Sequence, residues 1–279
     1  MKLGQKLSIG WIRVQLKTLS AVSAEAAGNK AFDLFCTPFY RSQTPQPEIF
    51  RQADRLELLT GGKKVFGHRW NASAEKTILI VHGFESTSYN FEKYISPLLE
   101  RGFGVMAFDA PAHGSSEGKR INAIDYCRVI ASISERYGPI YGVVAHSFGG
   151  LATALWAETA EPGPEKLALI APATETSTAV DAFSRFLNLT PPVKRAFEHR
   201  IKELSGHDVS WFSVPRTLEA HPKKVLWVHD QDDDVTPFSD ARRFMERRPE
   251  NVTFMVTSGL GHRRIYREQS VIDAVVAYF

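Results

Sequence analysis

The sequence predicts an α/β fold built on a mostly parallel central sheet. Short apolar runs that are typical of buried strands alternate along the chain with stretches of helical character. Strands separated by helices of about 10–15 residues are typical of parallel sheets with right-handed crossovers. The length of 279 residues and the hydrophobic content of 43% allow one sizeable core.

The elements expected before the parallel strands are two helices and a hairpin. Residues 1–20 mix apolar and cationic side chains and are expected to form an amphipathic arm. A second helix is expected over residues 23–35, with Ser23 as its N-cap. Three prolines then mark an extended linker. A hairpin follows, with its strands at residues 56–60 and 64–68.

Six buried strands and the helices between them complete the predicted sheet, which has about eight strands in all. The six strands are expected at residues 77–81, 104–108, 140–145, 167–170, 225–229 and 252–256. Two of the intervening helices are expected near residues 90–101 and 121–137.

The most informative stretch is Val143 to Gly150, where an apolar run ends in a serine and two glycines open a helix. A serine on a sharp strand-to-helix turn needs small neighbours, because the turn brings backbone segments close together. Ala145 and Gly149 supply them two residues before and two residues after Ser147. This is the Gly-x-Ser-x-Gly spacing of a nucleophile elbow, with alanine in the first glycine position. The stretch therefore predicts that Ser147 is a nucleophile.

Two later strands end in residues that complete a hydrolytic triad. An aspartate-rich segment, Asp230 to Pro237, follows the strand at 225–229, and His262 follows the strand at 252–256 in a glycine turn. The chain order serine, aspartate, histidine, each just after a strand, belongs to the α/β-hydrolase arrangement. Chymotrypsin-like and subtilisin-like enzymes use other orders.

With these residues in place, the chain resembles the α/β-hydrolase superfamily from about residue 55 to its C-terminus. Thr77–Phe84 matches the family's strand that ends in His-Gly, and Asp109–Ser116 matches its Asp-x-Pro-Gly-His-Gly-x-Ser turn, with Ala112 where glycine is usual. His229–Pro237 matches the His-Gly-x-x-Asp-x-x-x-Pro segment, with Asp230 in the glycine position.

The resemblance implies a role for each site residue. Ser147 would attack the substrate carbonyl, and His262 would act as the general base that activates it. Asp233 would orient the histidine and stabilise its cation. The backbone N–H groups of Phe84 and Phe148 would form the oxyanion hole.

The identity of the triad acid depends on the alignment to Pro237, which places the acid at Asp233. Its neighbours Asp232 and Asp234 remain alternatives, since an error of one residue is enough to exchange them. Glu175 is a further alternative, because some family members place the acid after the preceding strand.

The resemblance also divides the chain into parts. Residues 1–53 would form an N-terminal helical arm and linker, residues 54–173 and 224–279 the hydrolase core, and residues 174–223 a helical cap. Fifty residues are too many for a simple connection, so the cap should have structure of its own. Five apolar residues of the cap are expected to line an acyl pocket, although its aromatics could simply fill the cap's own core: Phe183, Phe186, Leu187, Trp211 and Phe212.

The basic N-terminal arm allows two interpretations. It carries four cations and no acidic residue before Glu25. The favoured interpretation is an arm that packs on the hydrolase domain and buries Leu7, Trp11 and Leu16. In the alternative, the arm lies on an anionic membrane surface.

Composition excludes several function classes. A net charge of +3 is too small to indicate a nucleic-acid partner, and no run of 18 apolar residues indicates a transmembrane helix. Cys36 and Cys127 fit neither a metal site nor a redox pair, and no cofactor or metal is expected. Without a signal-peptide pattern, the expected location is the cytoplasm. The oligomeric state is left open.

The predicted function is a serine hydrolase that cleaves a carboxylic ester or thioester through an acyl-enzyme. The same residues would serve an amidase, a peptidase or an acyltransferase, so the bond type stays open. A non-catalytic ligand-binding module on the same fold is the alternative from another class.

Overall fold

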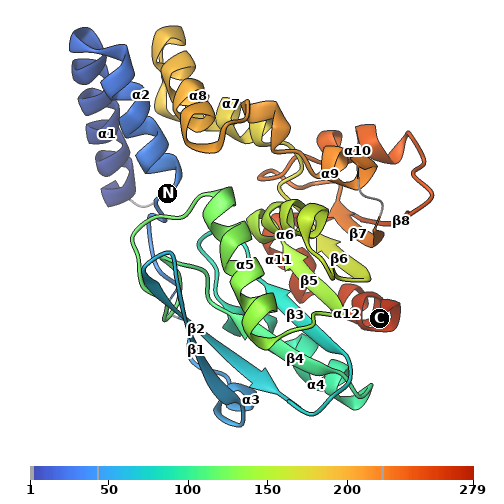
Figure 1. Ribbon diagram of the computed structural model, residues 1–279. Helices are drawn as coiled ribbons and strands as arrows, with labels where there is room; N and C mark the ends of the chain where they lie inside the picture. Colours follow the sequence, from blue (N-terminus) through green and yellow to red (C-terminus); the bar gives the residue numbers. More distant parts are fainter. Residues whose placement is uncertain (1–2, 43, 221–222) are drawn as a thin grey trace. The chain divides into compact units, whose positions relative to one another are not determined.

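The computed structural model describes residues 3–42, 44–220 and 223–279, with side chains described from Ile9 onward (Figure 1). The chain forms two compact units. A helical unit comprises Met1–Thr37 and Glu175–Phe212, and a sheet unit comprises Pro38–Thr174 and Ser213–Phe279. The helices of the predicted arm thus fall in one unit with residues 175–212 of the predicted cap, a grouping that the sequence did not predict, whereas residues 213–220 of that cap fall in the sheet unit.

The sheet unit is built on eight strands in the order β1-β2-β4-β3-β5-β6-β7-β8, which confirms the predicted strand number. β2 pairs antiparallel with both β1 and β4, and the remaining neighbours pair in parallel. The strands are β1 (Asp54–Thr60), β2 (Lys63–Trp70), β3 (Thr77–Val81), β4 (Gly104–Phe108), β5 (Gly142–His146), β6 (Lys166–Ile170), β7 (Lys224–Asp230) and β8 (Val252–Thr257).

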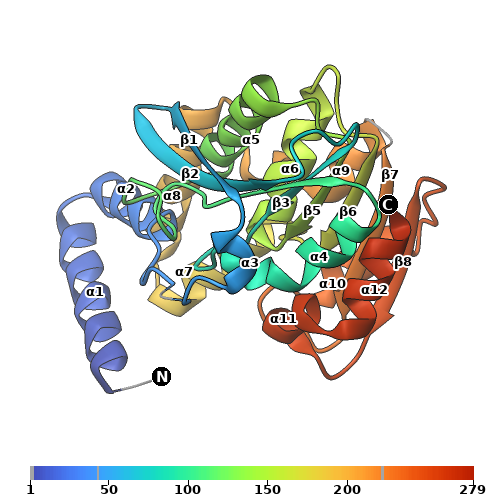
Figure 2. The ribbon, with the colours of Figure 1, turned by 90° about the horizontal axis from the view of Figure 1, so that it is seen from below.

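Helices cover both faces of this sheet, as parallel strands require because they are apolar on both sides. Figure 2 shows α5, α6 and α9 on one face and α4 and α12 on the other. The helices of the sheet unit are α3 (Glu48–Arg51), η1 (Ser88–Phe91), α4 (Glu92–Glu100), α5 (Ala123–Tyr137), α6 (Phe148–Thr159), α9 (Val214–Ala220), α10 (Phe238–Met245), α11 (Gly261–Arg264), η3 (Ile265–Arg267) and α12 (Gln269–Tyr278).

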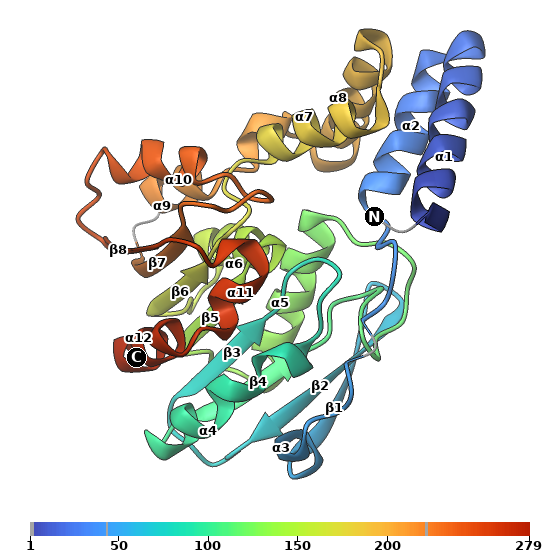
Figure 3. The same ribbon diagram turned by 180° about the vertical axis from the view of Figure 1, so that it is seen from behind.

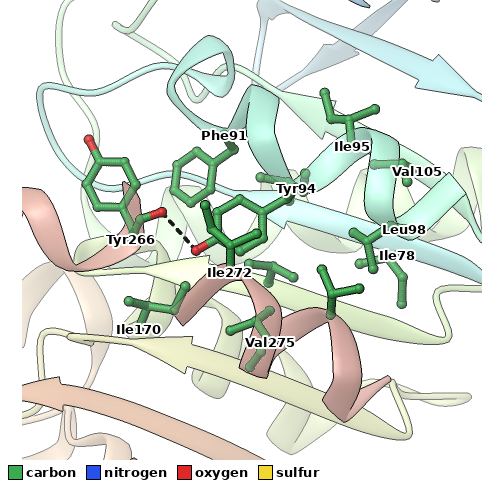
Figure 4. Close-up of a cluster of buried hydrophobic side chains, with 14 of the residues drawn as sticks. Ile78, Phe91, Tyr94, Ile95, Leu98, Val105, Ile170, Tyr266, Ile272 and Val275 are labelled. Atoms are coloured by element: carbon green, nitrogen blue, oxygen red, sulfur yellow. Dashed lines mark hydrogen bonds between the residues drawn. The ribbon is translucent and has the colours of Figure 1, made fainter. Parts of the chain in front are cut away.

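One apolar cluster lies between α4, α12 and the sheet (Figure 4). Phe91 stacks on Tyr266, with their ring centroids 5.0 Å apart. The buried Tyr94 hydroxyl donates to the Tyr266 carbonyl at 2.8 Å, so the core directly fixes the segment that follows His262 (Figure 4).

The helical unit contains α1 (Leu3–Val22), α2 (Ala24–Phe35), α7 (Thr176–Leu187), α8 (Pro191–Ser205) and η2 (Val209–Trp211). Ser23 caps α2 as predicted, because its side chain accepts a hydrogen bond from the Ala26 N–H. α2 packs closely on α8: a Cβ built on Gly28 would lie only 2.6 Å from the Ala196 Cβ. Glycine is therefore required where the two helices meet.

The arm residues that were expected to be buried differ in their exposure. Leu16 is buried, but Trp11 is 63% exposed, so the expected burial of Trp11 is wrong. The side chain of Leu7 lies outside the described residues. No helix in the described ranges is both long and apolar enough to span a bilayer.

Candidate active site

Ser147 lies on the tight turn between β5 and α6. β5 is an inner strand, paired with β3 on one side and β6 on the other. The serine has φ 55° and ψ −123°, a strained conformation for a residue with a side chain. The crowding expected of an elbow is present, because a Cβ on Gly149 would meet the His82 carbonyl oxygen at 2.4 Å.

His262 connects the serine to an acid. Its Nε2 lies 2.9 Å from the Ser147 Oγ, and its Nδ1 lies 2.8 Å from Oδ2 of Asp233. All three side chains are buried. With the Nδ1 proton directed at the carboxylate, Nε2 is left as the acceptor for the serine hydroxyl. The structure thus brings together the three residues that the sequence singled out.

The Asp233 carboxylate makes four hydrogen bonds, three of them within the loop after β7. Oδ1 accepts the N–H groups of Val235 and Thr236, while Oδ2 accepts the Thr236 hydroxyl and the His262 ring. Burial raises the pKa of the Asp233 carboxyl, but the hydrogen bond and charge of His262 and the two backbone donors outweigh it and lower the pKa below its usual value. The carboxyl therefore stays ionised beside the histidine.

The alternative acids are engaged differently. The Asp232 carboxylate accepts hydrogen bonds from the Ser258 hydroxyl and the Gly259 N–H. Asp234 is exposed, and Glu175 precedes α7 in the helical unit. Within the aspartate-rich loop, Asp233 is the residue whose carboxylate reaches the His262 ring.

The loop after β3 lies against the nucleophile. A Cβ built on Gly83 would lie 2.9 Å from the Ser147 Cβ, so glycine is needed for this approach. His82 accepts the Ala110 N–H at Nε2, which leaves its Nδ1–H to donate to the Gly83 carbonyl at 2.7 Å. In a trans peptide the carbonyl and the next N–H point in opposite directions. His82 therefore fixes the direction of the Phe84 N–H.

A second histidine holds the next peptide of the same loop. His113 Nε2 accepts the Glu85 N–H, and its Nδ1 lies 2.9 Å from the Pro111 carbonyl, to which it donates. Glu85 has φ 56°, an unusual backbone conformation that this bond supports. Burial, aided by the nearby His82, lowers the pKa of His113 to about 3, so the ring stays a neutral acceptor.

The expected oxyanion donors lie on the two loops that meet here. Neither the Phe84 N–H nor the Phe148 N–H has a hydrogen-bond acceptor among the residues that the structure describes. The two phenyl rings contact each other edge to face, with centroids 5.8 Å apart. Both amides are therefore available to a ligand oxygen.

Asp230, at the position where the family has glycine, is a residue whose importance sequence reasoning missed. Its buried carboxylate accepts four hydrogen bonds: Oδ1 from the Asp232 and Gly261 N–H groups, and Oδ2 from the Leu260 N–H and the Thr257 hydroxyl. Burial raises the pKa of Asp230, but these bonds outweigh it and lower the pKa. One carboxylate thus connects the loop of Asp233 to the turn that carries His262. In the sequence, the presence of aspartate where the family has glycine was the signal that could have indicated this role of Asp230.

His146 supports the site from the elbow. Its Nε2 lies 3.1 Å from the His262 carbonyl oxygen, to which it donates, and its ring lies 4.4 Å from that of Tyr266. Burial, followed by the charge of His262, lowers the pKa of His146 well below its usual value. His146 is therefore a neutral side chain that holds the backbone at His262 by a hydrogen bond.

The five residues predicted to line a pocket belong, as far as their observed contacts go, to the packing of the helical unit. Phe183 contacts Phe35 and Phe197, and Trp211 stacks on His207. Leu187 and Phe212 are buried, whereas Phe186 is 38% exposed. The role of these five residues in binding a substrate therefore stays a prediction.

Comparisons with known proteins agree with this fold. A family model described as serine aminopeptidase, S33, matches residues 72–222, more than half of the chain. Among curated proteins, the uncharacterised protein YqkD of Bacillus subtilis is 23% identical over 182 residues, which cover 62% of this chain and 60% of YqkD. The uncharacterised hydrolase YugF of the same organism is 32% identical over 93 residues, which cover 32% of this chain and 34% of YugF. The matches thus span less than two thirds of these relatives.

Solved structures are similar over a larger part of the chain. The esterase Pf2001 of Pyrococcus furiosus superposes with a TM-score of 0.64 at 20% identity, over 87% of this chain and 94% of that one. Est1E of Butyrivibrio proteoclasticus, solved with ferulic acid bound, gives 0.62 at 19% identity, over 80% and 97% of the two chains. At these identities the likeness shows the fold alone, and it confirms the predicted fold class.

Proposed function

This chain belongs to the α/β-hydrolase family described as serine aminopeptidase, S33, and from that membership and the site geometry we propose that it is a serine hydrolase acting on carboxylic esters or thioesters. The observation that carries the proposal is the continuous hydrogen-bond chain from Ser147 through His262 to Asp233. Esterases among the similar structures support the ester class.

In the proposed acylation step, the Ser147 Oγ attacks the carbonyl carbon of the substrate. As the new C–O bond forms, the hydroxyl proton moves to the His262 Nε2, and the carbonyl oxygen becomes an oxyanion held by the N–H groups of Phe84 and Phe148. When the intermediate collapses, the bond to the leaving alcohol or thiol breaks. The His262 Nε2–H then protonates that leaving group, and an acyl-serine remains.

Water completes the cycle in the deacylation step. The His262 Nε2 takes a proton from water as its oxygen attacks the acyl carbon, and the same proton returns to Ser147 Oγ as the carboxylic acid leaves. Asp233 stays ionised throughout and stabilises the imidazolium that forms in each step. Its lowered pKa suits that role.

The experiment that tests this proposal combines a fluorophosphonate probe with a panel of p-nitrophenyl esters, thioesters and amides. We expect probe labelling and ester turnover in the wild-type protein, and loss of both in Ser147→Ala, with kcat lower by about a million-fold. Ser270→Ala, an exposed serine on α12, is the matched control and should behave as wild type. Undiminished labelling of Ser147→Ala would overturn the proposal, and turnover of amides alone would assign the peptidase alternative.

The acyl pocket is the finer part of the proposal. Phe186 is the test position, because its ring is the most exposed of the five predicted lining residues, and its truncation disturbs the packing of the helical unit least. Phe186→Ala should shift the preference among acyl chain lengths while acetate esters react at an unchanged rate. Each methylene in an apolar pocket is worth about 1–3 kcal/mol, so the profile should change gradually with chain length.

A further inference from the structure

Helix α1 has two apolar faces, although only one of them has a partner in its own unit. The inner face packs on α2, which the ribbon views show alongside it (Figures 1 and 3), and also contacts α7. Leu16 is buried there, with Ile12 and Leu19 half-buried. The Arg13 guanidinium donates to the Phe186 carbonyl and so attaches α1 to α7.

The outer face carries large apolar side chains in solvent. Trp11 is 63% exposed, Val14 55% and Val22 86%. The steps from 11 to 14, 18 and 22 are those of one helix face, so these residues and the exposed Thr18 form one stripe. A helix that needed only to cover its own unit would have polar residues on this side.

The charge of α1 is of one sign. The helix has cations at Lys6, Arg13 and Lys17 and no acidic residue, and Lys2 lies just before it. Lys17 lies one helical turn after Val14 and so flanks the apolar stripe. Lys17 is exposed. An apolar stripe beside a cationic flank is complementary to a surface that is anionic outside and apolar beneath.

We propose that the outer face of α1 binds an anionic lipid surface, with the helix axis parallel to the membrane plane. Trp11 would lie at the level of the headgroups, where tryptophan is favoured, and Val14 and Val22 would enter the acyl boundary. The exposed Lys17 would face the lipid phosphates, while Arg13 keeps its bond to the Phe186 carbonyl. At 20 residues, α1 offers a contact about 30 Å long.

Charge argues against a second copy of this chain as the occupant. Two α1 helices paired through the stripe would bring two cationic, acid-free helices together with no counter-charge from either. Like charges at such a distance oppose association. An anionic bilayer supplies the missing charge.

The test uses the full-length protein and sedimentation with vesicles of phosphatidylglycerol and phosphatidylcholine, beside vesicles of phosphatidylcholine alone. We expect binding to the anionic vesicles at low salt, weakened by added salt, and little binding to the neutral ones. Trp11→Ser combined with Val14→Ser should weaken binding about tenfold or more. Lys17→Glu should weaken it about thirtyfold, since each unit of charge near such a surface is worth about fivefold.

Matched controls make the same chemical changes on the sheet unit. Leu59→Ser removes an exposed apolar side chain from β1, and Lys93→Glu reverses an exposed charge on α4. Both should bind vesicles as wild type, and all variants should keep the wild-type melting temperature. The proposal is overturned by equal binding of the α1 variants and the controls. It is also overturned if sedimentation velocity shows that the Trp11 and Val14 substitutions dissociate an oligomer without changing vesicle binding.

Discussion

Removal of the Asp230 carboxylate should lower kcat, although Asp230 is not expected to contact the substrate. Two of its four hydrogen bonds hold Leu260 and Gly261, the two residues directly before His262. Gly261 has φ 61°, a left-handed conformation that glycine adopts at no steric cost but that its flexible backbone does not hold by itself. In Asp230→Ala the turn loses these bonds, and the His262 ring is free to leave its position between Ser147 and Asp233.

The size of the effect follows from the observed bonds. The four donors belong to exposed or half-buried residues, so water can partly replace the carboxylate. A net loss of about 0.5–1 kcal/mol for each bond gives about 2–4 kcal/mol of stability. A displacement of the general base by about 1 Å costs on the order of a hundredfold in rate. We therefore expect kcat for a p-nitrophenyl ester to fall about 10- to 100-fold, with KM unchanged.

The assay measures kcat and KM in two backgrounds. If Asp230 acts through His262, then Asp230→Ala should lower kcat in the wild-type background and should not further lower the residual rate of His262→Ala. Asp230→Asn keeps one oxygen for the Asp232 and Gly261 N–H groups, so its kcat should lie between that of the wild type and that of Asp230→Ala. In proton NMR, the His262 Nδ1–H that bonds Asp233 should broaden in Asp230→Ala.

A core variant separates this positioning role from general instability. Ile133→Ala, on α5, should cost a similar 2–5 kcal/mol and leave kcat per folded molecule unchanged. The reasoning about Asp230 is refuted if its removal lowers the rate equally in both backgrounds, or if Ile133→Ala lowers kcat as much.

Two other predictions follow from the packing and from the buried histidines. Gly149→Ala places a Cβ 2.4 Å from the His82 carbonyl oxygen, so it should cost at least about 1–3 kcal/mol of stability and most of the esterase activity. Gly10→Ala has open space at its Cβ and should be neutral or stabilise the protein by up to about 1 kcal/mol. Urea unfolding measures both changes in stability. The pKa of His113 is lowered from 6.5 to about 3, so below pH 6.5 the unfolded chain binds a proton that the folded chain does not. Stability is therefore complete above pH 6.5 and should fall by about 1.4 kcal/mol per pH unit for this residue alone as the pH decreases toward 5. His82, His146 and His229, whose pKa values burial also lowers, add to the same slope, and a urea midpoint that stays constant from pH 7 to 5 would contradict it.

Local sequence patterns predicted most of the fold. The strand runs, the Ser23 cap and the glycine at 149 are short-range features, because a strand, a helix start or a tight turn is determined by residues that are close along the chain. The candidate Ser147 and His262 were also visible, since each follows directly on a strand whose end is clear in the sequence.

What the sequence left open depended on contacts between distant segments. The choice of Asp233 over Asp232 and Asp234 needed the meeting of two loops whose residues lie 29 positions apart, and Ser147 lies 115 positions from the histidine that it contacts. The parallel pairing of β7 with β8 brings those loops to one edge of the sheet.

The role of Asp230 and the outward side of α1 also emerged only in three dimensions. From sequence, Asp230 is one more acidic residue in a polar loop, and Trp11 is an apolar residue of a helix with apolar positions all around. Three of the four donors reach Asp230 because β8 places the His262 turn next to it. Trp11 is exposed because α2 and α7 occupy the other side of α1. A sequence determines which local structures a chain can form, while the partners of each side chain are decided by how those structures pack, because burial and hydrogen bonding depend on neighbours that are far away along the chain.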